Sequence, residues 1–130
     1  MVTRPRFPDA QVLLAEVLLP LVGAGRVGSQ TPPNLQQALP FIRVVRAGGR
    51  SDRLCDFARV EVDVFHRTYA EGSALAGDVQ EFLTTQRLRS PTGLVDRVAV
   101  EVAPVEVPWA SGVRRFGARY LIVTRRTRRR

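Results

Sequence analysis

The sequence predicts an α+β fold, in which a mixed, largely antiparallel sheet of four to five strands carries two helices packed on one face. Apolar residues recur at helical spacing in two segments, and they alternate with polar residues at period two in the segments that follow. Short loops between successive strands favour antiparallel neighbours over crossover connections. A chain of 130 residues suffices for one core that buries roughly 65–70% of the unfolded surface. We expect residues 1–124 to form this domain and residues 125–130 an Arg-rich tail.

The first helix is expected to begin after Pro8, because the Asp9 carboxylate can accept hydrogen bonds from the free amides of a first turn. Pro20 and Gly23 should kink or end it. Residues 23–40 are rich in Gly, Pro, Gln and Asn, which predicts an extended connection with a short strand near residues 26–30. The apolar residues at helical spacing in this first helix are Val12, Leu13, Val17 and Leu21.

Residues 41–46 and 55–66 are predicted to form two strands. Residues 47–53, which contain Gly48 and Gly49, then form a hairpin loop. In the second strand Phe57, Ala58, Val60, Val62 and Val64 alternate with Arg59, Glu61 and Asp63.

A second helix should begin near Thr68, whose hydroxyl fits a capping box with Glu71 three residues later. Its mainly apolar stripe consists of Leu75, Val79, Phe82, Leu83 and Gln86. Two strands are expected to follow, near residues 98–103 and 113–124, with residues 104–112 connecting them.

All 20 basic residues are arginine, and the net charge is +8. Five of these charges lie among residues 125–130, so the remainder of the chain carries +3 (8 − 5). The terminal arginines could neutralise phosphates, but no aromatic residues are interleaved with them to stack on bases. Cys55 is the only cysteine, which excludes an intrachain disulfide, and no run of ~18 apolar residues predicts a membrane span.

We expect no catalytic, cofactor or metal site. Gly23, Gly25 and Gly28 match a dinucleotide fingerprint in letters only, because they follow a predicted helix instead of leading from a strand into one. His66 is the only histidine, and a nucleophile such as Cys55 would have to meet it in space.

Glu61 and Asp63 share one face of a strand and could in principle hold a cation, but two carboxylates supply too few oxygen ligands. Alternation on a solvent-facing surface explains both residues, with Arg59 on the same face to pair with them.

The segment from Arg46 to Asp56 combines three arginines and two aspartates around its two glycines. It is either a plain flexible hairpin or a projecting loop that docks on a neighbouring subunit, where alternating charges would fix the register of the contact.

The run LPFIRVVRAGGRSDRLCDFARVEVDVF, from Leu39 to Phe65, resembles the tail terminator proteins of siphophages, the phages with long non-contractile tails. The likeness continues through the second helix into PVEVPWASGVRRFGARYLIVTRR at residues 104–126, and it includes the first helix with Phe7 and Pro8. It covers about residues 7–126 and rests on structural residues, not on a catalytic constellation. The arginines at positions 128–130 are not required by it.

The resemblance implies a non-enzymatic, cofactor-free virion protein that assembles in the host cytoplasm and lies at the head-proximal end of the tail. It would form a homo-hexameric ring on the tail tube protein, stop tube growth and present the surface for a head-closure or neck protein. DNA would pass through the ring without sequence-specific contacts, and no membrane is involved. The residues expected at assembly or lumen contacts are Arg46, Gly48, Gly49, Arg50, Asp52, Arg53, Arg114, Arg115 and Arg119.

Three other functions remain open from the residues alone. Another neck component would bind capsids and not tail tubes. A small basic nucleic-acid-binding protein would bind DNA tightly, in a salt-dependent way that requires residues 125–130. A small enzyme would need a cleft that gathers His66, Cys55 or the carboxylates.

Overall fold

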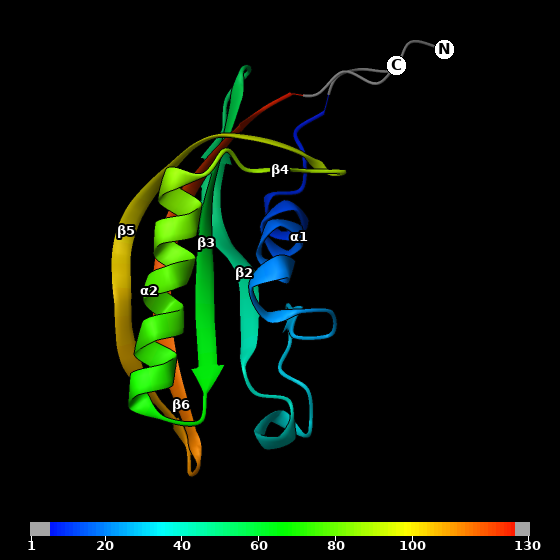
Figure 1. Ribbon diagram of the computed structural model, residues 1–130. Helices are drawn as coiled ribbons and strands as arrows, with labels where there is room; N and C mark the ends of the chain where they lie inside the picture. The colour runs from blue at the N-terminus through cyan, green and yellow to red at the C-terminus, as the bar shows by residue number, and fades with distance from the viewer. Residues whose placement is uncertain (1–5, 127–130) are drawn as a thin grey trace.

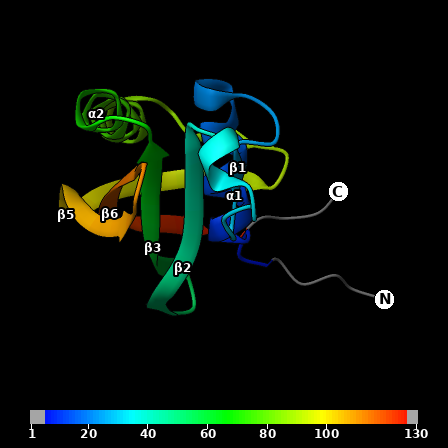
Figure 2. The same cartoon turned by 90° about the horizontal axis from the view of Figure 1, so that it is seen from below.

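The computed structural model describes residues 6–126 and contains two helices and one curled sheet (Figures 1 and 2). The elements in chain order are α1 (Ala10–Val22), β1 (Val27–Gly28), the short 3-10 helix η1 (Leu35–Gln37), β2 (Phe41–Ser51), β3 (Cys55–His66), α2 (Tyr69–Thr85), β4 (Arg89–Ser90), β5 (Gly93–Ala110) and β6 (Val113–Arg125).

The sheet has the strand order β1-β2-β3-β6-β5-β4. Only β1 and β2 pair in parallel, and the other neighbours are antiparallel. The mixed, largely antiparallel sheet is therefore confirmed, but the expected number of four to five strands is wrong, because residues 6–126 form six. The extra strand is β4, which has two residues and carries no periodic pattern that a sequence could reveal.

Both helices begin where their capping residues predict. Asp9 Oδ1 accepts a hydrogen bond from the Val12 amide at 3.1 Å, and Thr68 Oγ1 accepts one from the Glu71 amide at 3.2 Å. The Thr68 hydroxyl in turn donates to the Glu71 carboxylate at 3.0 Å. Pro20 lies inside α1 instead of ending it, and the chain leaves the helix at Gly23 with a φ of 96°.

One face of the sheet carries both helices, as expected (Figure 2). The core between the helices and the sheet is an apolar cluster, in which Leu13, Leu14 and Leu18 of α1 and Val79 and Leu83 of α2 are buried. The sheet contributes its inward-facing side chains to this cluster: Ile42, Val44, Ala58, Val60, Val62, Val64, Phe116, Ala118, Tyr120 and Ile122.

Two predicted loops are strands in the structure. β2 continues through Gly48 and Gly49 to Ser51, so the loop expected at residues 47–53 shrinks to a turn at residues 52–54. The resulting β2–β3 hairpin projects beyond the helices at the top of Figure 1. β5 likewise runs through residues 104–110, because bulges along its pairing with β6 accommodate Pro104 and Pro108.

Candidate functional site

The face of the sheet opposite α1 and α2 carries charged side chains from four neighbouring strands. The antiparallel register places Glu61 of β3 opposite Arg119 of β6, and Phe65 opposite Arg115. Because side chains alternate along a strand, these residues point away from the helices. We call this surface the ionic face and define it as Arg43, Arg59, Glu61, Asp63, Glu101, Arg115 and Arg119.

Asp63 is the centre of the ionic face. Its Oδ2 accepts hydrogen bonds from Arg43 Nη2 at 2.6 Å and Nε at 3.1 Å. Arg115 approaches from the other side, with Nε 3.3 Å from Asp63 Oδ1. The Asp63 side chain is only 5% exposed, so this charge depends on its two guanidinium partners.

Gly117 lies opposite Asp63 in the β3–β6 register. A Cβ atom at Gly117 would be 3.0 Å from Asp63 Oδ1 and 3.5 Å from a methyl group of Val107. The missing side chain leaves room for the Asp63 carboxylate and opens a shallow depression of about 190 Å³ between β3, β6 and β5.

Two further ion pairs flank Asp63. Arg119 Nη2 lies 3.2 Å from Glu61 Oε1, and Arg59 Nε lies 3.1 Å from Glu101 Oε1 on β5. The expectation that Arg59 pairs with Glu61 and Asp63 is therefore wrong, and so is the solvent-facing placement of Asp63. The ionic face contains four arginines and three carboxylates, so its net charge is +1 (4 − 3).

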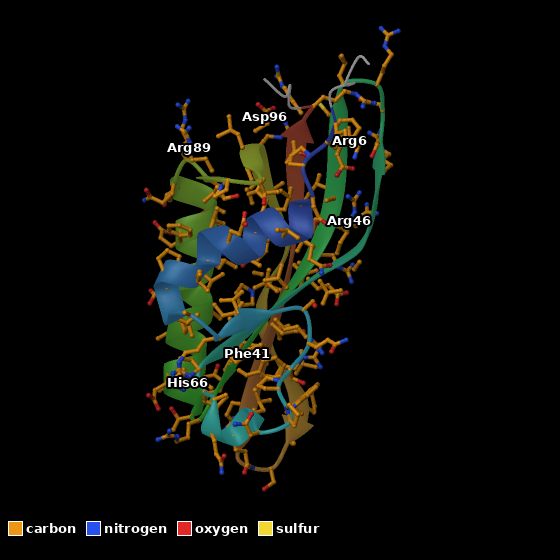
Figure 3. The ribbon with its side chains drawn as sticks, turned by 90° about the vertical axis from the view of Figure 1, so that its right-hand side faces the viewer. Arg6, Phe41, Arg46, His66, Arg89 and Asp96 are labelled. Carbon is orange, nitrogen blue, oxygen red and sulfur yellow. The ribbon has the colours of Figure 1, made fainter. Side chains whose placement is uncertain are left out.

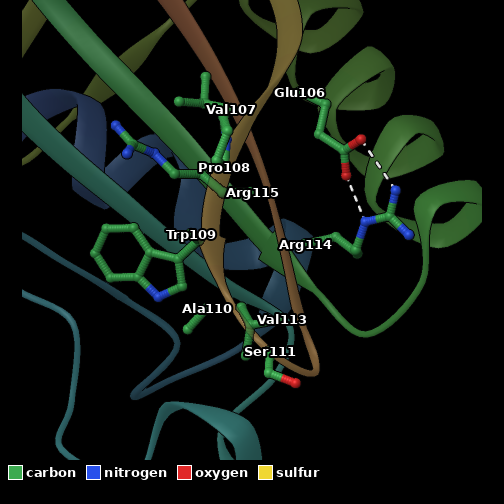
Figure 4. A pocket seen from close by; sticks show the side chains of 9 residues that line it. All are labelled: Glu106, Val107, Pro108, Trp109, Ala110, Ser111, Val113, Arg114 and Arg115. Carbon is green, nitrogen blue, oxygen red and sulfur yellow. Dashed lines mark hydrogen bonds and ion pairs between the residues drawn. The ribbon is translucent and has the colours of Figure 1, made fainter.

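Trp109 adds an aromatic surface next to these charges. Its ring meets that of Phe65 edge to face, with the ring centroids 5.0 Å apart. The guanidinium carbons of Arg43 and Arg115 lie 5.6 and 5.3 Å from the Trp109 ring centroid. Trp109 also borders a 420 Å³ pocket at the β5–β6 end of the sheet (Figure 4). The two arginines that pair with Asp63 thus also make cation–π contacts with the Trp109 indole, which is 42% exposed.

The three arginines expected near the last strand divide between the two faces of the sheet. Arg115 and Arg119 belong to the ionic face. Arg114 lies on the other side, where it pairs with Glu106 (Figure 4) and stacks over Tyr69 at 5.6 Å. This pairing raises the pKa of Arg114 and lowers that of Glu106.

The projecting β2–β3 hairpin is stabilised by side-chain hydrogen bonds. Arg46, labelled in Figure 3, donates from both terminal nitrogens to Asp56 at 2.7 and 2.8 Å, and Ser51 Oγ donates to Asp56 at 2.7 Å. Burial by itself would raise the pKa of Asp56, but these hydrogen bonds outweigh burial and hold that pKa below its usual value. Arg50 lies 4.4 Å over the Phe57 ring.

The tip of the hairpin is fixed by backbone contacts. Asp52 Oδ1 accepts from the amides of Leu54 and Cys55, both at 2.8 Å, and the Arg53 carbonyl accepts from Arg126 Nε at 2.9 Å. These two amides lower the pKa of Asp52. The interpretation of this segment as a plain flexible loop is not supported by this geometry.

The two glycines of the hairpin have different roles. Both have positive φ, 133° at Gly48 and 123° at Gly49. A Cβ atom at Gly49 would lie 2.0 Å from the Phe57 carbonyl oxygen, whereas one at Gly48 would meet nothing within 4 Å. Gly49 is therefore required for the close pairing of β2 with β3, and Gly48 for its conformation alone.

The residues considered for catalysis do not gather. His66 and Cys55 are the two ends of β3, which by strand rise are about 36 Å apart. His66 lies beside the start of α2 (Figure 3), where its Nδ1 accepts from the Arg67 amide at 2.8 Å. Gly23 and Gly25 leave α1 and lead into β1, so this fingerprint does not open a helix.

Residues 6–126 contain neither a metal-binding cluster nor a membrane-spanning helix. No group of three or more His, Cys, Asp or Glu residues is placed to hold a metal ion there. In the same part of the chain, no helix is long and apolar enough to cross a membrane. Arg128, Arg129 and Arg130 of the terminal tract lie outside the described residues.

Arg115 and Arg119, expected from the sequence as assembly or lumen residues, lie on the ionic face. The sequence did not single out Arg43 and Glu101 of that face or the neighbouring Trp109. A signal existed for Trp109, since it is the only tryptophan and follows a strand-like Val-rich run. No local pattern could have paired Arg43 with Asp63 across 20 positions or Arg59 with Glu101 across 42.

No protein-family model and no curated protein sequence matches this chain. Its fold is similar to that of a chain in the solved structure of the virion of a native gene transfer agent particle. The two chains superpose with a TM-score of 0.63 and are 18% identical, and the match covers 89% of this chain and 94% of the other. This likeness establishes a shared fold across nearly the whole of both chains.

Proposed function

We propose that this chain is a non-enzymatic virion structural protein that caps the phage tail tube. In this proposal six copies form a ring at the head-proximal end of the tail, end tube growth and present the surface for a head-closure or neck protein. Assembly would take place in the host cytoplasm. The observation that carries the proposal is the fold that this chain shares, almost end to end, with a protein of a gene transfer agent virion.

The chemistry of the ionic face is compatible with a wall past which DNA moves. Its arginines are opposed by carboxylates, as in the Arg43–Asp63 and Arg119–Glu61 pairs. A guanidinium already paired in the protein gains less from a phosphate than a free one does, so contacts with passing DNA would be weak and sequence-independent. We therefore propose that Arg115 and Arg119 face the lumen of the ring.

The hairpin supplies a second surface for assembly. Arg46, Asp52 and Asp56 fix its shape before any partner binds. A surface that is ordered in advance loses little conformational entropy on association. We propose that Gly48, Gly49, Arg50 and Arg53 belong to a subunit contact.

The test is negative-stain microscopy of the tail tube protein polymerised with and without this protein. Tubes of limited length with density at one end would support termination. Unchanged tube lengths with bare ends would overturn it. A chain ending at Arg126 is the matched control, because it keeps every described residue and lacks the last three arginines.

The same materials separate the alternatives. Binding to portal-bearing capsids, together with no effect on tubes, would favour a head-closure or head–tail joining role. Tight, salt-sensitive DNA binding by the full chain that is lost when residues 125–130 are deleted would favour a nucleic-acid-binding protein.

A further inference from the structure

Helix α1 has a second apolar stripe that nothing within the described chain covers. Only one of its 13 residues, Glu16, is ionisable. One stripe, which includes Leu14, packs into the core. The second contains Val12 and Leu19, which are 42% and 38% exposed. They are seven positions apart and so lie on one side of the helix. A helix that is apolar on both sides is normally buried on both sides.

This second stripe forms one wall of a groove of about 300 Å³ between α1, β1 and β2. Its apolar lining includes Val12, Ala15, Leu19 and Val27, and the Glu16 side chain stands among them. Ser90 Oγ donates to Glu16 Oε1 at 2.6 Å, which fixes the carboxylate and lowers its pKa. The groove therefore presents an apolar channel with a fixed negative charge.

The complementary shape lies at the tip of the β2–β3 hairpin. Leu54 is 70% exposed, more than any other large apolar residue among those described. The turn that carries it is held by Asp52, whose carboxylate accepts from the Leu54 and Cys55 amides. Arg53 is its neighbour in the chain and is exposed. The tip therefore presents an apolar side chain next to a positive charge.

We propose that the Leu54 tip of one copy of this chain inserts into the α1 groove of a second copy, with Arg53 beside Glu16. The groove is large enough for an isobutyl side chain, and the charges of the two surfaces are opposite. Tip and groove are different patches of one molecule, so the contact is head-to-tail and can close into a ring. The inference rests on the proposed function, since it assigns the subunit contact that such a ring needs.

The first test is disulfide trapping between separate chains in a Cys55→Ala background. One chain carries Leu54→Cys and the other carries Val12→Cys, so no crosslink can form within a chain. Under mild oxidation the mixed dimer should form about tenfold faster than in a control mixture of Leu54→Cys and Val105→Cys chains, because docking raises the effective concentration of the two thiols. Val105 is 54% exposed and lies on β5. A rate no faster than that of the control would overturn the contact.

Charge reversal tests the second half of the proposal with the same readout. Glu16→Arg in the Val12→Cys chain should slow crosslinking, and Arg53→Glu in the Leu54→Cys chain should restore it. Slowing without restoration would overturn the Arg53–Glu16 pairing, provided that circular dichroism shows both variants folded.

Failure of this contact and failure of the proposed function are distinguishable. Capped tubes without specific crosslinks would reject the contact and leave tail termination standing. Specific crosslinks with uncapped tubes would support the contact and reject tail termination. If Val12→Asp abolished capping while no specific crosslink formed, the groove would accept the tube protein, and the proposed occupant would be wrong.

Discussion

The two faces of the same sheet are stabilised by different interactions. The helix-covered face buries Val60, Val62, Tyr120 and Ile122 at 1% exposure or less. The opposite face carries Asp63, Arg115 and their ionic neighbours on the alternate positions of the same strands. The first face is stabilised by apolar burial, which is non-directional, and the second by charge pairs, which require defined geometry. One strand can thus supply stability on one side and a charged working surface on the other.

The largest effect is expected on the helix-covered face. Leu14→Ala removes a side chain with 0% exposure, and we expect the free energy of unfolding to fall by about 2–5 kcal/mol. The matched change on the other face is Val105→Ala, which should cost less than about 0.5 kcal/mol because that side chain is half exposed. Urea denaturation measures both. Similar losses for the two variants would refute the contrast between the faces.

On the ionic face, Asp63→Ala should have the largest effect. It leaves the guanidinium groups of Arg43 and Arg115 without their shared carboxylate, at a cost of about 1–3 kcal/mol. Arg59→Gln breaks the more exposed pair with Glu101 and serves as the control, with an expected loss below about 1 kcal/mol. If thermal unfolding ranks the control as the more damaging change, Asp63 does not organise this face.

Both faces of the sheet also depend on the backbone pairing of β2 with β3. Substitutions at the two hairpin glycines test that pairing. Gly49→Ala should destabilise by about 1–3 kcal/mol, because the new methyl group collides with the Phe57 carbonyl and the φ is unfavourable. Gly48→Ala has the same kind of φ without the collision, so its loss should be smaller. Hydrogen exchange of the β2 and β3 amides would locate the damage, and equal protection in the two variants would contradict this account.

The smallest effect is expected from Asp56, a carboxylate that is 2% exposed on the largely apolar side of the sheet and is paired with Arg46. Its pKa is lower in the folded chain than in the unfolded chain, so the unfolded state binds more protons as the pH falls. The stabilisation is therefore present above the unfolded pKa, near 3.8, and is lost as the pH falls through the folded pKa. Asp56→Asn should flatten the loss of stability as the pH falls below about 3.8. If the free energy of unfolding fell equally with pH at acid pH in both proteins, Asp56 would not contribute to the acid sensitivity.

The sequence by itself determined the local structure of this protein. Asp9 and Thr68 marked the two helix starts, because side-chain caps act within one turn. Alternation in residues 55–66 gave the central strand and both of its faces, because side-chain direction in a strand has a period of two. Only the tertiary structure decided how long the neighbouring strands are. Position 49 of β2 requires glycine because a side chain there would collide with the Phe57 carbonyl on β3, and the prolines of β5 fit because bulges in its pairing with β6 accept them.

The partners of the charged residues were likewise decided only by the tertiary structure. Arg43, Asp63 and Arg115 are far apart in the chain and meet because the order β2-β3-β6 places them side by side. Arg114 and Arg115 are adjacent in sequence but belong to opposite faces (Figure 4). A local pattern fixes which way a side chain points, whereas its partner depends on strand order and register, which are set by packing across the whole sheet.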